Sequence, residues 1–427
     1  MRNHVVHVML CWRVHRRATG HARYCERVKS LGFVVALAGC GFQSNPVQVA
    51  PIDGRDGVDA ASGSRGPDGA VTVHMPDAAI PPMPPDARIC FGVGALTVCL
   101  NVVPAAPVTL VGSATPFDTS GPGCTQLVTQ TAGPELCVIA GTSITVTGAL
   151  VAVGARPLVL VATDEITVTA AGVVDVSSRI NPRRAGAGAG TGNCAAAGRG
   201  TSDSDGAGGG AGGSFGTTGG KGGVGNNTPG DAVAGGAPGA VQPTPTNVRG
   251  GCKGGAGGDG NGGASNTGGA AGDGGGGVYL IAGTKITIAG NVFASGAGGG
   301  ANHTSGGREQ GGGGGGTGGM IGLDAPSIDV TGRVVANGGA GGGGGALSTG
   351  GNPGGDGTTT SHNTRAIGGT ADILAGAGAD GTAAGLTTNL DGASALGAGG
   401  GGAGGLGYVL TYGALQGTLI SPVPIKR

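Results

Sequence analysis

Short stretches that alternate apolar and small polar residues recur along the chain. The clearest is Ile144-Thr145-Val146-Thr147-Gly148, and similar stretches follow at 166–169, 286–290 and 328–332, with a looser one at 417–420. This alternation predicts strands with one buried face. The first two copies begin 22 residues apart, at Ile144 and Ile166, which is about the length of one coil of a parallel β-solenoid.

Apolar runs flank each full copy. Those upstream lie at 138–139, 158–161, 278–281 and 320–323, and those downstream at 150–153, 173–176, 292–294 and 334–336. Three short strands per repeat cannot bury their apolar face alone, but stacked repeats can. We therefore predict an all-β fold, a short parallel β-solenoid-like stack with long glycine-rich insertions. A β-sandwich with disordered glycine-rich loops is the alternative.

Long glycine tracts separate the later repeats, at roughly 184–277, 296–319, 338–352 and 366–407. The chain has 104 Gly and 23 Pro among 427 residues, a composition typical of disorder because glycine loses much backbone entropy on ordering and buries no side chain. Glycine chains can instead form extended threefold helices that hydrogen-bond to neighbours. Insertions from one edge of a solenoid would lie side by side, so both outcomes remain open.

The N-terminal region predicts export. Arg27 and Lys29 precede an apolar run at 31–38, and Gly39 and Cys40 follow. A charged segment, a short apolar segment and small residues form a secretory signal, so 1–39 is read as a signal peptide. Residues 1–26 do not fit this pattern, and we expect either a true start near Val28 or an unusually extended charged region before the apolar run.

Composition divides the rest of the chain. Residues 40–88 are rich in Pro, Asp and Gly and are predicted to be a disordered, semi-rigid tether. An N-terminal β region with the first coils is expected at 89–181, and a glycine-rich repeat region with interspersed coils at 182–427. Residues 1–39 hold seven of the 24 Lys and Arg and one of the 24 Asp and Glu. The remainder is therefore net acidic and lacks a basic stripe, which argues against a nucleic-acid partner.

Six cysteines remain after Cys11, Cys25 and Cys40 are set aside, and an exported protein favours disulfides. They are Cys90, Cys99, Cys124, Cys137, Cys194 and Cys252. We expect pairing between nearest neighbours, 90–99, 124–137 and 194–252.

Leu37-Ala38-Gly39-Cys40 resembles a bacterial lipobox, which implies that Cys40 becomes the first mature residue and carries lipid. Together with the tether and the GGAGG-type tracts, it makes residues 40–427 similar in texture to predicted bacterial surface lipoproteins with PGRS-like glycine-rich sequence. The resemblance implies an outer-membrane lipoprotein that faces the periplasm or the cell surface. Gly41, where an Asp would signal inner-membrane retention, agrees with this. The N-terminal module of mycobacterial-type PGRS proteins is absent, so their roles do not transfer.

No catalytic, cofactor or metal site is predicted. Asp164, Glu165 and Asp175 are read as solvated turn residues rather than as the paired carboxylates of a glycosidase. His303 and His362 lie in glycine-rich loops, and Lys221 lacks the spacing of a phosphate loop. Residues 254–261 match part of one calcium-binding nonapeptide, but such sites need stacked copies.

Threonines at the repeats are predicted to form ranks on one outward face. They are Thr145, Thr147, Thr167, Thr169, Thr287 and Thr331. A flat Thr-x-Thr array can bind ice, although threonine is also simply a good strand residue.

These features predict a non-enzymatic, lipid-anchored envelope protein with a structural, matrix or adhesive role. Its expected partners are the membrane, through the anchor, and polysaccharide or other envelope components. A carbohydrate-active β-helix enzyme and a calcium-binding module are the alternatives.

Overall fold

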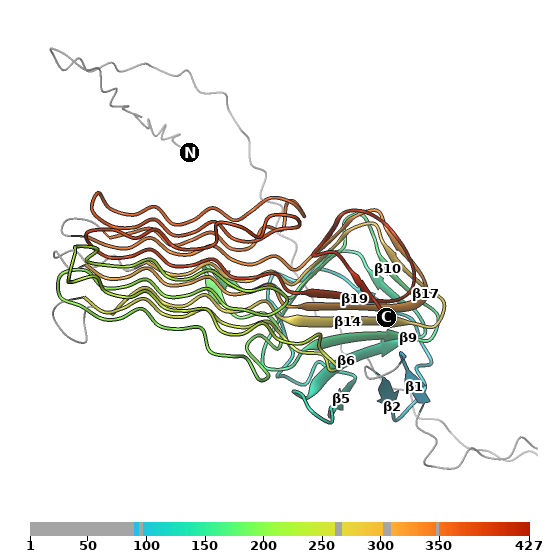
Figure 1. Ribbon diagram of the computed structural model, residues 1–427. Helices are drawn as coiled ribbons and strands as arrows, with labels where there is room; N and C mark the ends of the chain where they lie inside the picture. Colours follow the sequence, from blue (N-terminus) through green and yellow to red (C-terminus); the bar gives the residue numbers. More distant parts are fainter. Residues whose placement is uncertain (1–88, 94–96, 261–266, 302–308, 347–349) are drawn as a thin grey trace, which may run out of the picture. The chain divides into compact units, whose positions relative to one another are not determined.

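Short strands stack in parallel into coils with three faces, so the chain forms a β-solenoid (Figure 1). The computed structural model describes residues 89–93, 97–260, 267–301, 309–346 and 350–427. The predicted signal peptide, Cys40 and the tether lie outside the described residues, as do Asn261 and His303.

The first two faces belong to one 11-stranded sheet, because two long strands bend through both. The strands of the first face are β6 (Leu136–Gly141), β9 (Leu158–Ala162), β14 (Gly277–Ala282), the first halves of β17 (Met320–Val330) and β19 (Tyr408–Gln416), and β21 (Ile425–Lys426). Those of the second face are β3 (Val108–Leu110), β7 (Ile144–Val146), β10 (Glu165–Val168), β15 (Lys285–Ile288) and the second halves of β17 and β19.

A separate six-stranded sheet forms the third face. Its strands are β4 (Phe117–Asp118), β8 (Ala149–Val153), β11 (Val173–Asp175), β16 (Asn291–Phe293), β18 (Arg333–Val335) and β20 (Ile420–Ser421). Each named pair in this face is parallel, as in the other stacked faces. The predicted parallel stack is therefore confirmed, and the β-sandwich alternative is wrong.

Like residues stack above one another inside the coils. The ladder of the second face aligns Val108, Ile144, Ile166, Ile286, Ile328 and Leu415. The four isoleucines are completely buried in the main core, where burial of an aliphatic side chain contributes about 1.5–3 kcal/mol. Leu415, and not the predicted stretch 417–420, holds this position in the last coil. Gly417, at φ +138°, instead begins the turn into the third face.

A second apolar core covers the outer side of the first face, so β9 and β14 are buried on both sides. Val159, Tyr279 and Met320 point into this core. The antiparallel hairpin of β1 (Ile89–Phe91) and β2 (Val98–Leu100) contributes Val98 and Leu100 to it. This accounts for the unbroken apolar runs at 158–161 and 278–281, since a strand that is buried on both faces does not alternate.

Three shorter strands complete the described β structure. They are β5 (Gln126–Val128), which pairs antiparallel with β6, and the hairpin of β12 (Arg179–Ile180) and β13 (Arg183–Arg184). The described residues contain no helix that is long and apolar enough to cross a membrane.

The glycine-rich insertions all leave the solenoid at the same corner. Each begins beyond a third-face strand or the β12–β13 hairpin and returns to the first-face strand of the next coil, at β14, β17 or β19. Figure 1 shows the tracts running side by side away from the sheets. In the described residues they are held by regular backbone hydrogen bonds, so of the two outcomes that the sequence leaves open, ordered packing is the one observed there.

The tract 309–319 lies at the centre of this glycine bundle and contacts six neighbouring tracts. The N–H groups of Gly312, Gly315 and Gly318 donate to Gly399, Gly402 and Gly405 at 2.9–3.0 Å. The N–H groups of residues 311, 314 and 317 donate to tract 252–258, and those of residues 313, 316 and 319 donate to tract 294–300. The carbonyl groups of the central tract accept hydrogen bonds from tracts 207–213, 269–275 and 339–345. This period of three is that of a polyproline II helix, which has three residues per turn and no internal hydrogen bonds.

Glycine is required in this central tract by close approach of the backbones. A Cβ atom built on Gly314 would lie 1.9 Å from the carbonyl oxygen of Ala211, and one on Gly315 would lie 2.2 Å from that of Gly339. The absence of side chains is therefore what allows the tracts to satisfy each other's backbone groups.

Candidate functional site

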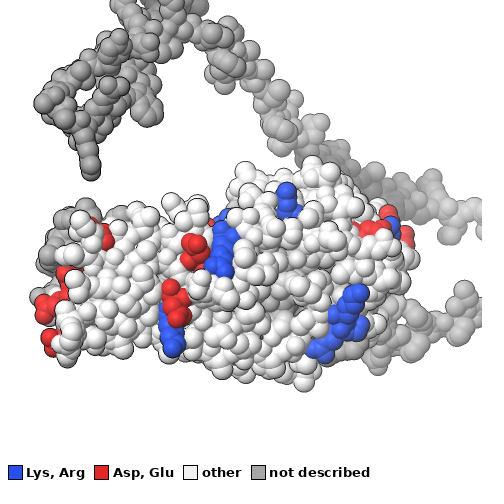
Figure 2. All heavy atoms as spheres, turned by 45° about the horizontal axis from the view of Figure 1, so that its top comes forward, with Lys and Arg blue, Asp and Glu red and all other residues white. Residues whose placement is uncertain are grey.

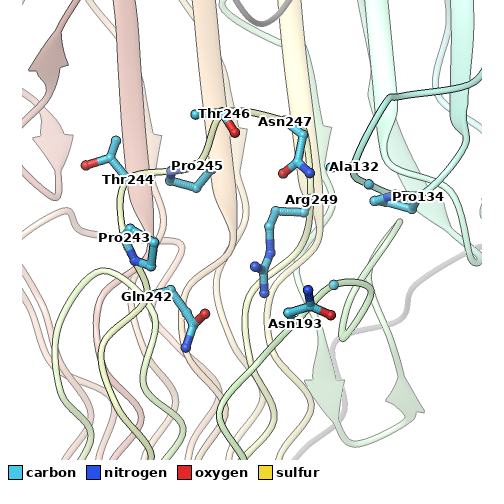
Figure 3. Close-up of a pocket in the computed structure, with 12 residues that line it drawn as sticks. Ala132, Pro134, Asn193, Gln242, Pro243, Thr244, Pro245, Thr246, Asn247 and Arg249 are labelled. Atoms are coloured by element: carbon cyan, nitrogen blue, oxygen red, sulfur yellow. The ribbon is translucent and has the colours of Figure 1, made fainter.

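A cavity of about 610 Å³ opens beside the outer side of the first face. One wall is the segment 242–249 of the first glycine-rich insertion, and the other includes residues 132–134 from the loop before β6. Gly192 and Asn193 complete the lining (Figure 3). A neighbouring cavity of about 430 Å³ shares Ala132, Thr246 and Asn247 with it, so the two line a continuous region.

Gln130 joins the two walls. Its side-chain amide donates to the carbonyl of Val248 at 2.8 Å, and its carbonyl oxygen accepts from the Val248 N–H at 2.7 Å. The same amide donates to the carbonyl of Pro134 at 2.8 Å. These three bonds fix the otherwise irregular segment around Val248, which is itself buried in the second core.

Arg249 lies at the base of the cavity, and its guanidinium points between Gln242 and Asn193 (Figure 3). The guanidinium carbon lies 5.0 Å from the centre of the Phe215 ring, and Nη2 donates to the sulfur of Cys194 at 3.1 Å. Phe215 in turn packs edge-on against Tyr408 at 5.0 Å. The Tyr408 hydroxyl donates to the carbonyl of Gln242 at 2.6 Å, which closes this cluster.

The charge of Arg249 is buried, and no described residue provides a counter-ion. The residue is 9% exposed, and its Nε–H has no hydrogen-bond partner among the described residues. None of the ion pairs in the described part of the chain includes it. Burial lowers its pKa from the ordinary value. A buried cation is costly unless it is paired, so the base of this cavity favours an anion.

The surrounding surface makes this cation distinctive. Only 11% of the residues are charged, and Figure 2 shows their side chains in small groups separated by wide uncharged areas. Some charges near the corner where the insertions leave are paired with one another. Asp273, for example, accepts from Arg183 at 3.2 Å and from Lys253 at 3.1 Å.

The six cysteines expected to pair form three disulfides with the nearest-neighbour pattern, Cys90–Cys99, Cys124–Cys137 and Cys194–Cys252. The third joins two distant parts of the first insertion, and both of its sulfurs lie near the Arg249 guanidinium. This disulfide therefore helps to form the base of the cavity.

Asp175 is not the solvated turn residue that the sequence predicted. It lies in β11, is 6% exposed, and accepts from Arg184 at 2.7 Å, with Arg179 at 3.6 Å. The β12–β13 hairpin folds these arginines back over the strand, which the sequence pattern did not indicate. Asp164 instead accepts a hydrogen bond at 2.8 Å from the exposed Thr284 hydroxyl, and Glu165 is exposed.

The remaining sequence candidates lie apart from one another. Lys221 is exposed in the glycine bundle, and His362 is in a distant loop. Asp259, from the partial calcium motif, accepts from the backbone of Gly268 at 2.8 Å and pairs with Arg199. Among the described residues no three His, Cys, Asp or Glu side chains come together in a way that would hold a metal ion.

One rank of threonines does form on the second face. Thr109, Thr145, Thr167 and Thr287 stand in register, and Asp329 and Gln416 continue the same row. Asp329 pairs with Lys285 at 2.5 Å. Thr147, Thr169 and Thr331 lie just beyond the strand ends, and Thr169 donates to the carbonyl of Val146 at 3.1 Å. The strands therefore present one threonine each and not a Thr-x-Thr pair.

The sequence pattern did not identify Arg249 as a candidate site residue. Its only local signal is its position between a Pro- and Thr-containing stretch and Cys252, in an otherwise uncharged segment. Comparisons with models of known protein families, with curated proteins and with solved structures gave no match.

Proposed function

We propose that this protein is a non-enzymatic, lipid-anchored component of the bacterial cell envelope that has a structural or adhesive role. In this proposal Cys40 carries the lipid, residues 40–88 act as the tether, and the glycine bundle is the displayed part. The chain would face the periplasm or the cell surface from the outer membrane.

The observation that supports a display role is the packing of the glycine bundle. The central tract 309–319 contacts six neighbours through backbone hydrogen bonds. Such packing orders a long projection that contains few apolar side chains. Because its residues are small, backbone and hydroxyl groups remain at its surface. Polysaccharide or another envelope component is the partner class that such a surface suits.

The insertions also share one corner of the solenoid, which keeps their ends together. Each of the three coils that begin at β14, β17 and β19 is preceded by an insertion that adds to the same bundle. A solenoid that serves as the frame for a projection fits a structural or adhesive role, since the frame fixes the base and the bundle reaches outward.

Metabolic labelling with palmitate tests the anchor. Wild-type protein should incorporate label and fractionate with the outer membrane, whereas Cys40→Ala should lose both. Ser44→Ala, four residues beyond Cys40, is the matched control and should behave like wild type. Unlabelled wild-type protein in the soluble fraction would overturn the localisation.

Antibody binding to intact cells then separates the two orientations. An epitope tag at 347–349, between two glycine tracts, should be detected on intact cells if the bundle faces outward. Detection only after the outer membrane is permeabilised would place the bundle in the periplasm, and would overturn a role in contact with other cells.

A further inference from the structure

We propose that the cavity above Arg249 binds the carboxylate of an acidic saccharide, a uronic acid residue within a polysaccharide chain. This rests on the proposed adhesive role, and it names the class of polysaccharide that the protein would bind. Four observations carry it: a cation with no ion-pair partner among the described residues, a rim of neutral polar groups, an extended cavity and a rigid base.

The cation sets the charge of the ligand. Arg249 is almost completely buried, and it has no carboxylate partner among the described residues. The Phe215 ring and the Cys194 sulfur offset only part of its desolvation. The planar guanidinium favours carboxylate, which it can bind through two parallel N–H donors.

The residues around the opening of the cavity indicate the chemistry of the uncharged part of the ligand. Asn193, Gln242 and Asn247 carry amides, and Thr244 and Thr246 carry hydroxyls, all around the opening (Figure 3). These groups donate and accept hydrogen bonds without charge, as sugar hydroxyls require. Pro243 and Pro245 supply apolar edges between them. The lining thus combines neutral polar groups with apolar surface.

The size of the cavity suits more than one sugar. Its volume of about 610 Å³ lies within the range of roughly 300–1,000 Å³ that is usual for small-molecule sites. The adjoining cavity of about 430 Å³ continues past Thr246 and Asn247. A ligand with one carboxylate at Arg249 and further sugar residues along this region would fill both.

The base of the cavity is preorganised. Three contacts hold Arg249 and the segment 242–249 in place. They are the Cys194–Cys252 disulfide, the Phe215–Tyr408 ring pair and the two hydrogen bonds between the Gln130 side chain and the backbone of Val248. Gly192 lies directly against the guanidinium, since a Cβ atom there would be 2.8 Å from its central carbon. Preorganisation of this kind increases affinity because less freedom is lost on binding.

Isothermal titration calorimetry of the full chain in detergent tests the proposal, with trigalacturonate as the ligand. Its methyl ester, which has the same shape without the charge, and neutral galactotriose are the ligand controls. We expect trigalacturonate to bind and both controls to bind at least about tenfold more weakly, the difference expected for loss of a charge-assisted pair worth about 1.4 kcal/mol or more.

Variants locate the site. Arg249→Met should abolish binding, Arg249→Lys should weaken it about tenfold because lysine lacks the bidentate geometry, and Thr246→Val should weaken it two- to tenfold. Thr167→Val, on the second face of the solenoid, is the matched control and should bind like wild type. If thermal melting shows that Arg249→Met is unfolded, Arg249→Lys and Thr246→Val decide the question.

Several outcomes would overturn the proposal. These are equal binding of acid and ester, binding unchanged in both Arg249→Lys and Thr246→Val, and binding of inorganic phosphate or a free peptide C-terminus in place of trigalacturonate. The result is independent of the palmitate experiment, so an unlipidated protein that binds trigalacturonate would overturn the anchor and keep the site. A protein that incorporates palmitate but does not bind trigalacturonate would overturn the site and keep the anchor.

Discussion

The solenoid and the glycine bundle order the same chain by opposite means. In the solenoid, isoleucine and valine stack inside the coils, and backbone hydrogen bonds run between neighbouring strands. In the bundle almost no side chain is available, and each tract satisfies its backbone groups through neighbours on several sides. Side chains hold the coils together, whereas the lack of side chains lets the tracts approach.

The difference implies an order of dependence. A backbone hydrogen bond contributes about 0.5–1.5 kcal/mol net, and fixing one residue costs about 1–2 kcal/mol in backbone entropy. In a tract with one donor and one acceptor per residue, the free energy gained from hydrogen bonds is thus about equal to the cost in backbone entropy. Because the solenoid holds the ends of the insertions at one corner, we infer that it supplies the alignment on which the bundle depends.

The largest expected effect comes from breaking the link within the first insertion. Replacing Cys194 and Cys252 by serine opens a loop with a sequence separation of 58, for which the chain-entropy relation gives roughly 4 kcal/mol of lost stability. Removing the Cys90–Cys99 pair, with a separation of 9, should cost roughly 2.6 kcal/mol by the same relation. Urea unfolding of both double variants checks this, and a larger loss for the shorter loop would argue against it.

Breaking the solenoid core should loosen both regions. Ile166→Ala removes a fully buried side chain from the central ladder and should cost about 3 kcal/mol. The neighbouring outward Thr167→Ala should cost less than about 0.5 kcal/mol. Urea unfolding gives the two values, and amide exchange should show faster opening in the bundle as well as in the coils for Ile166→Ala. A bundle that keeps full protection in this variant would refute its dependence on the solenoid.

Breaking the bundle should leave the coils intact. Gly314→Ala places a methyl group against the Ala211 carbonyl and should destabilise the bundle by about 2 kcal/mol. Gly355→Ala, whose nearest contact would be the Ile367 carbonyl at 3.2 Å, is the matched control and should be tolerated. Amide exchange should accelerate in the glycine tracts 252–258, 294–300 and 309–319 for the first variant only, with β7, β10 and β15 unchanged. Equal effects of the two substitutions would contradict the close packing of the central tract.

The smallest effect concerns the second core. The Tyr279 hydroxyl donates to the buried Asp324 carboxylate at 2.8 Å, and the Val93 N–H also donates to that oxygen at 2.9 Å. Burial, followed by the charge of Asp324, raises the pKa of Tyr279 above its ordinary value of 10.0. Tyr279→Phe should cost about 1.5 kcal/mol near pH 7.

The pH dependence of Tyr279 follows from the direction of its shift. Because the pKa is raised in the folded state, this stabilisation is complete below pH 10 and falls as the pH rises above 10. Urea unfolding between pH 8 and 11 should therefore show wild type losing stability faster than Tyr279→Phe above pH 10. Parallel curves would show that the tyrosine does not resist ionisation.

Much of the scaffold could be predicted from the sequence because it repeats. The alternation around Ile144, Ile166, Ile286 and Ile328 identified the strands of the second face, and the flanking apolar runs identified the other two faces. The last coil was misplaced because its Ala-Leu-Gln stretch at 414–416 lacks the Ile-Thr alternation. The order of the glycine tracts could not be decided, since it depends on six neighbours that are distant in sequence.

The candidate site was beyond the same reasoning. Arg249 becomes distinctive only when Phe215, Cys194 and Gln242 surround it, and these come from separate parts of the first insertion. Asp175 resembled a turn residue because its arginine partners lie in a short hairpin with no periodic signal. Burial of charge is a property of the folded chain, and a pattern of apolar positions does not encode it.

Amide hydrogen exchange of the central tract tests most directly whether the glycine bundle is ordered. The N–H groups of Gly312, Gly315 and Gly318 each donate to a neighbouring carbonyl. We predict that they exchange roughly a thousandfold or more slowly than the same amides in an unstructured peptide, as opening by about 4 kcal/mol would require. Exchange at the rate of the unstructured peptide, with β10 and β15 still protected, would show that the glycine bundle is not ordered although the solenoid is folded, and would contradict this account.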